Sequence, residues 1–110
     1  MTYAEAALLR PGDHVVIDTS ENMRKYGYCV MPSMLQSAGE EVVIDRCLDN
    51  NEISDDGEVL ATHRIFYLRD LQGRSKAYFY SEGTIARRVD SAPPATASEL
   101  MDFLFSGVGL

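Results

Sequence analysis

The chain has 110 residues, of which 45% are hydrophobic and 25% charged, and it carries a formal net charge of -7. This length and apolar content suit one folded domain and exclude a disordered chain. The acidity argues against bulk binding to nucleic acid or to an anionic membrane, and no apolar run reaches the ~20 residues that span a bilayer. Because no basic leader segment opens the sequence, we expect a cytoplasmic protein.

The first part of the chain predicts one short helix, one strand and two loops. Residues 2–9 are good helix formers, and a Pro-Gly pair ends that helix. Alternating apolar residues predict a strand over 14–18. The polar residues 19–22 predict a loop, and residues 23–38 predict a long, ordered loop with a short helix that Gly39 ends.

A second strand, over residues 41–48, is the clearest element of the sequence, because β-branched residues alternate with polar ones. Residues 49–58 are polar and acidic and predict a turn that contains Asp56-Gly57, a hairpin signal. Further short strands are predicted over 58–61, 65–69, 76–80 and 84–89. Short strands about ten residues apart, with no long helix between them, predict a small, mainly β, antiparallel barrel or sandwich.

The C-terminal part predicts a linker and an apolar helix. Residues 90–97 contain a Pro-Pro pair and form the linker, and residues 98–110 form the helix. A helix this short is unstable alone, so we expect it to dock on the barrel, on a second copy as a homodimer, or on a partner. The side chains predicted to dock are Leu100, Met101, Phe103, Leu104 and Phe105.

Several short motifs of the chain occur together in one known group of proteins. They are Gly12-Asp13 before Val15 and Ile17, Tyr26-Gly27, Met34, Gly39 before Val42 and Ile44, and Tyr78-x-Tyr80-Ser81-Glu82 before Ile85. This series resembles small SH3-like barrel proteins encoded by phages and prophages, over roughly residues 11–89. The resemblance implies an antiparallel SH3-like barrel over residues 1–89 and a viral origin, hence a host-cell cytoplasm. It implies no reaction, because most proteins of that group are uncharacterised.

Charge is unevenly distributed along the sequence. Residues 40–58 hold eight acids and one base and sum to -7, whereas residues 64–88 hold six bases and two acids and sum to +4. We expect an acidic face that docks on a host protein with a basic surface. The alternative is a solvated hairpin whose acids only confer solubility. The acidic face consists of Glu41, Asp45, Asp49, Glu52, Asp55, Asp56 and Glu58.

Two further sets of residues predict alternative binding surfaces. Tyrosines are numerous, and an aromatic groove of the kind that SH3-like barrels use for peptides is one interpretation; core packing is the other. Its candidate members are Tyr26, Tyr28, Tyr67, Tyr78 and Tyr80. Basic residues of the predicted last strands could contact nucleic acid, although the net charge disfavours it. Those candidates are Arg74, Lys76, Arg87 and Arg88.

No residue set predicts catalysis, a cofactor or a metal site. The two histidines, His14 and His63, and the two cysteines, Cys29 and Cys47, match no zinc-ligand spacing, and we expect free thiols. We therefore expect a non-enzymatic protein-binding module of phage or prophage origin that acts on a host protein. An inhibitor of a nuclease-type defence system, such as an anti-CRISPR, is one specific form of it. A nucleic-acid-binding accessory protein that uses residues 74–88 is the alternative.

Overall fold

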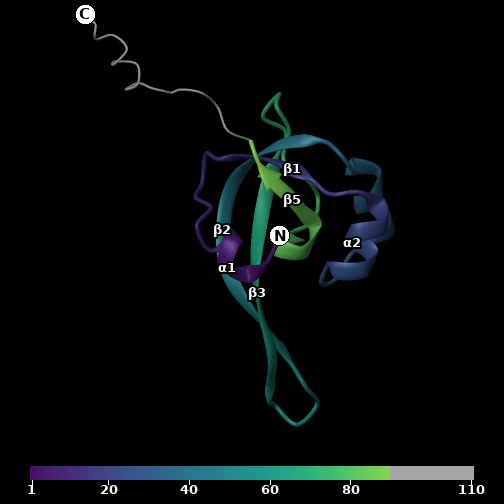
Figure 1. The fold of residues 1–110 in the computed structure, drawn as a ribbon, viewed down its shortest axis with the longest axis vertical. Coiled ribbons are helices and arrows are strands. Elements are labelled where there is room, and N and C mark those ends of the chain that lie inside the picture. The colour runs from purple at the N-terminus through teal and green to yellow at the C-terminus, as the bar shows by residue number, and fades with distance from the viewer. Residues whose placement is uncertain (90–110) are drawn as a thin grey trace, which may run out of the picture.

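The computed structural model describes residues 1–89, which form one antiparallel sheet with a few short helices around it (Figure 1). The mainly β prediction is therefore confirmed. The predicted linker, 90–97, and the predicted C-terminal helix, 98–110, with its five docking residues, lie outside the described residues. No helix among residues 1–89 combines the length and the hydropathy needed to cross a membrane.

Within residues 1–89 the sheet has five strands, in the order β4-β3-β2-β1-β5. The strands are β1 (His14–Ile17), β2 (Glu41–Ile53), β3 (Val59–Arg69), β4 (Tyr80–Ser81) and β5 (Ile85–Arg88). β1 lies between β2 and β5 and pairs antiparallel with both. Within the described chain β4 and β5 are the two edges and do not pair with each other, so the sheet is open and the expected closed barrel is not formed.

In the described part of the chain, four short helical segments cover the sheet. They are α1 (Tyr3–Ala6), α2 (Ser20–Tyr26), and the 3-10 helices η1 (Pro32–Ser37) and η2 (Glu82–Thr84). The prediction of a loop over residues 19–22 is wrong, because α2 starts there. The Thr19 side chain accepts the N–H of Asn22 and so caps the helix.

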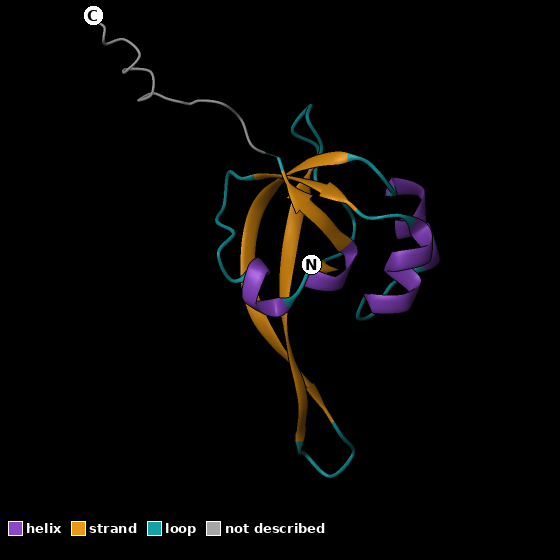
Figure 2. Cartoon of the chain, in the orientation of Figure 1, coloured by secondary structure: helices purple, strands orange, loops and turns teal. Residues whose placement is uncertain are grey.

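β2 and β3 are longer than the sequence predicts and form a twisted hairpin that projects from the body (Figure 2). Residues 49–53, expected in a turn, continue β2, and the predicted strands 58–61 and 65–69 are one strand, β3. β1 pairs only with residues 41–43 of β2, and β4 only with residues 65–66 of β3. The outer part of the hairpin, residues 51–62, is called the arm below.

The strand predicted over residues 76–80 is also wrong, since only Tyr80 of that segment lies in a strand. The chain bends at residues 77–78 instead. In the turn before this segment, the Asp70 carboxylate accepts the main-chain N–H groups of Gln72 and Arg74. The bond from the Arg74 main chain is the largest cause of the lowered pKa of Asp70.

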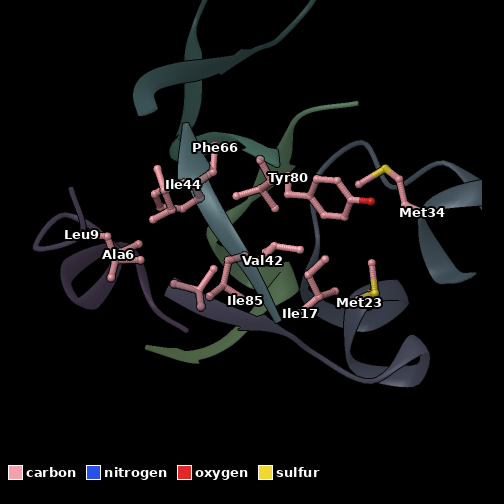
Figure 3. Packing of buried hydrophobic residues seen from close by; sticks show 12 residues of the cluster. Ala6, Leu9, Ile17, Met23, Met34, Val42, Ile44, Phe66, Tyr80 and Ile85 are labelled. Atoms are coloured by element: carbon pink, nitrogen blue, oxygen red, sulfur yellow. The ribbon is translucent and has the colours of Figure 1, made fainter. Parts of the chain in front are cut away.

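The hydrophobic core lies between the sheet and the short helices (Figure 3). Val42 and Ile44 of β2 point into it beside Phe66 of β3, as the alternation predicts. Met23 of α2 and Met34 of η1 are buried at one side and attach the long connection between β1 and β2 to the sheet. The arm therefore projects from the packed part of the sheet.

Candidate functional site

The predicted acidic face is largely engaged in contacts within the molecule. Pairing of β2 with β1 and β3 places a cationic or titratable partner next to four of its seven members. Each of these contacts joins side-chain atoms 2.9–3.3 Å apart: Glu41 with His14, Asp45 with Arg69, Asp49 with Arg64, and Glu52 with His63. These four carboxylates therefore belong to cross-strand pairs of the sheet and do not form one free acidic surface.

The remaining three acids lie at the outer end of the arm. Asp55, Asp56 and Glu58 are exposed in or beside the turn that joins β2 to β3, and they have no ion-pair partner within residues 1–89. The Asp56-Gly57 turn forms as predicted, with Gly57 at φ 86°. Within residues 1–89, the members of the predicted acidic face that have no ion-pair partner thus lie in or beside this turn.

Apolar side chains are exposed next to these acids. Ile53, Val59 and Leu60 keep 51%, 57% and 59% of their surface accessible. A two-stranded ribbon is only marginally stable in water, and exposed apolar side chains grouped at its end make it a candidate interaction surface. The outer end of the arm therefore combines an apolar patch with three free negative charges.

The five tyrosines of the predicted aromatic groove have separate environments. Tyr80 is buried in the core, and the guanidinium carbon of Arg46 lies 4.2 Å from the centroid of the Tyr67 ring. Tyr28 stacks on His63, whereas Tyr26 and Tyr78 are exposed. Instead of the predicted groove, the structure brings together Tyr28, His63 and Phe79. Tyr28 stacks on His63, and the ring centroids of Tyr28 and Phe79 lie 6.5 Å apart.

The basic residues proposed for nucleic acid are mostly paired. Arg74 contacts Asp70 at 3.0 Å, Lys76 contacts Glu40 at 2.7 Å, and the contact of Arg88 with Asp13 is 3.8 Å. Arg87 is exposed on β5. Three of the four candidates thus face an acid of the same chain, and nucleic-acid binding gains no support from their positions.

A cluster around His63 was not expected from the sequence. Its Nε2 lies 3.0 Å from Oε1 of Glu52, and its Nδ1 lies 3.0 Å from Oε2 of Glu82. The ring also stacks on Tyr28, with the ring centroids 4.2 Å apart and an interplanar angle of 11°. Burial lowers the pKa of His63, but the two carboxylates outweigh that effect, so the pKa is raised above its ordinary value.

Glu82 is the member of this cluster that joins β3 to η2. Besides contacting His63, its carboxylate accepts the main-chain N–H of Arg64 at 2.7 Å, just beyond the two residue pairs that β4 makes with β3. It also borders a hollow of about 390 Å³ whose wall includes Glu5, Tyr26 and Gly83. Among residues 1–89, no three His, Cys, Asp or Glu side chains form a group that could hold a metal ion.

Comparisons with known proteins identify no relative. No protein-family model, no curated protein and no solved structure matches this chain. The arm and the cluster at its root are therefore the features from which a function can be inferred.

Proposed function

We propose that the chain is a non-enzymatic protein-binding module that recognises its partner with the outer end of the arm. The observation that carries the proposal is the exposed apolar patch of Ile53, Val59 and Leu60 beside three acids that lack a cation in the described chain. Apolar contacts of this kind supply affinity, and unpaired charges supply steering and specificity.

The charge of the arm selects the kind of partner. Asp55, Asp56 and Glu58 complement a protein surface on which lysines or arginines surround an apolar groove. A second copy of this chain is disfavoured, because each copy carries a net charge of -7. Nucleic acid is disfavoured for the same reason, since the arm would meet a phosphate backbone with negative charge. We therefore infer a basic protein as the partner.

The strand order also supports an SH3-like interpretation of the fold. We infer a partly open, SH3-like sheet from the order β4-β3-β2-β1-β5 together with a 3-10 turn, η2, between the last two strands. Phage origin and the inhibition of a nuclease-type defence system remain predictions that rest on the resemblance of the sequence motifs. The arm would serve such an inhibitor as the element that enters the target.

Reversing the three arm acids is expected to slow association with the partner by about tenfold or more at low salt. The reason is that the variant D55K/D56K/E58K removes the complementary charge but leaves the fold, because all three side chains are exposed. The partner is first captured from host lysate on the wild-type protein, and its association rate is then measured by surface plasmon resonance at two salt concentrations.

The matched control is Glu21→Lys, which reverses an exposed acid on α2, far along the chain from the arm. A second variant, V59S/L60S, tests the apolar patch and is expected to accelerate dissociation. If both arm variants bind the captured protein as the wild type does, the arm is not the recognition element.

A further inference from the structure

His63 lies at the root of the arm, where three parts of the chain that are far apart in sequence meet. It sits on β3 opposite Asn50, one residue beyond the arm. One ring nitrogen contacts Glu52 of β2, the other contacts Glu82 of η2, and the ring face contacts Tyr28 of the loop after α2. The imidazole thus connects the arm both to the sheet edge and to that loop.

The geometry requires a particular charge state. A carboxylate accepts hydrogen bonds and cannot donate them, so both nitrogens satisfy their neighbours only when each carries a proton. A neutral ring has one N–H, and its other nitrogen would turn a lone pair toward a carboxylate oxygen. Both distances are 3.0 Å, which is hydrogen-bond length. The imidazolium, with a proton on each nitrogen, therefore satisfies this geometry best.

We propose that His63 is a proton-controlled clamp, which in its doubly protonated form ties the arm to η2 through Glu52 and Glu82 and which releases Glu52 when it loses one proton. Its use in regulating partner binding rests on the proposed docking role of the arm. The release itself does not depend on that role.

The two carboxylates differ in how easily they can leave. The side chain of Glu82 is only 12% exposed and also holds the main-chain N–H of Arg64. The side chain of Glu52 is 42% exposed and can turn into water. The neutral ring therefore keeps its proton on Nδ1, bonded to Glu82, and loses the bond to Glu52. The arm then loses one of its attachments to the body.

The other groups around the ring do not compete for this proton. Glu52 from β2 and Glu82 from η2 are the charged groups that face it. Tyr28, from the loop, has a raised pKa because of its hydrogen bond with Cys29 and its burial, so the phenol stays neutral where a histidine titrates. On β3 itself, the guanidinium of the neighbouring Arg64 is engaged with Asp49 and Cys47.

The effect on stability has a defined sign. Because the pKa of His63 is raised on folding, its contribution is fully present below the unfolded value of about 6.5. It is lost as the pH rises through the folded pKa. The loss begins above about pH 6.5, which is at or below physiological pH. A modest rise in pH therefore weakens the clamp.

The test uses the isolated full chain and needs no partner. Nitrogen-15 NMR of the imidazole rings between pH 5 and 9 reports the protonation of each nitrogen, and amide hydrogen exchange reports the opening of the arm. We expect both nitrogens of His63 to be protonated at pH 6 and only Nδ1 above its titration. Exchange in residues 51–62, corrected for its intrinsic pH dependence, is expected to rise several-fold across the same transition.

Two variants and one control complete the design. Glu52→Gln removes the carboxylate at an accessible position, so the protein still folds; the titration of His63 shifts to lower pH and arm exchange loses most of its pH dependence. His63→Gln fixes the released state at every pH. His14→Gln removes a histidine that contacts one carboxylate, the half-buried Glu41 outside the arm, and it leaves the arm unaffected.

The clamp is refuted if His63 titrates at or below the value of an unfolded histidine. It is equally refuted if wild-type arm exchange, after correction, is the same at pH 6 and pH 8, or if Glu52→Gln changes neither readout. Failure of the arm to bind a basic protein would leave these three results unchanged, so the two proposals fail separately.

Discussion

Replacing Phe66 by alanine is expected to lower the free energy of unfolding by about 4 kcal/mol. Phe66 is fully buried in the middle of β3 and lies among Ile44, Tyr80 and the other core residues (Figure 3). Truncation removes apolar contacts and leaves a cavity, because the neighbouring strands are held by hydrogen bonds and cannot close the space. Urea unfolding followed by far-ultraviolet circular dichroism measures the loss.

Leu60→Ala is the control for that substitution because it removes an apolar side chain from the same strand. Leu60 is exposed on the arm, so its loss should change stability by no more than about 0.5 kcal/mol. Equal effects of the two substitutions would show that Phe66 is not in the core. The comparison also separates the body of the protein, which depends on burial, from the arm.

Gly83→Ala is expected to destabilise the fold by about 3 kcal/mol, for a steric reason. A Cβ atom at this position would overlap the main-chain carbonyl of Tyr26, with its carbon only 2.5 Å away and the nitrogen of Gly27 at 3.1 Å. These are backbone atoms at the end of α2, so they cannot rotate aside as a side chain could. α2 and η2 would have to separate, and the amides of α2 should exchange faster in hydrogen-exchange measurements.

The matched control is Gly39→Ala, which tests a different reason why a position can require glycine, namely a positive φ. Gly39 has φ 79°, and a methyl group at this position would meet no atom within 4 Å, so the cost is the left-handed backbone alone, about 1 kcal/mol. If Gly83→Ala costs no more than Gly39→Ala, or if the exchange of α2 is unchanged, the close contact between α2 and η2 is wrong.

The arm shows why sequence reasoning reaches some of this fold and not the rest. Strand β1 and the Asp56-Gly57 turn follow from local pattern, since each depends on residues adjacent in sequence. Asn51 and its neighbours have turn composition, yet they lie in β2. The side chain of Thr62 donates a hydrogen bond to Asn51 at 2.9 Å, and Asp49 pairs with Arg64. Cross-strand partners thus override local preference.

The candidate site, too, can be predicted from the sequence only in part. The acidity of residues 40–58 and the free charges of the turn are visible in the sequence. The contacts of Asp45, Asp49 and Glu52 with residues of β3 are not visible in it, because the register of β2 with β3 shifts at an irregularity between Ile44 and Arg46. That shift also sets which residues meet His63. Only the alternation of polar residues on both strands of the hairpin could have indicated a cross-strand cluster there.

The position of β1 in the sheet has a consequence for how the chain folds during synthesis. The hairpin of β2 and β3 joins neighbouring segments and can form early, whereas Val15 of β1 pairs with Arg88 of β5, almost the whole described length away. Contacts between distant segments form slowly, because a long loop must close first. One edge of β1 therefore stays open until β5 has left the ribosome, and until then the nascent chain presents an unpaired strand to chaperones and to other chains.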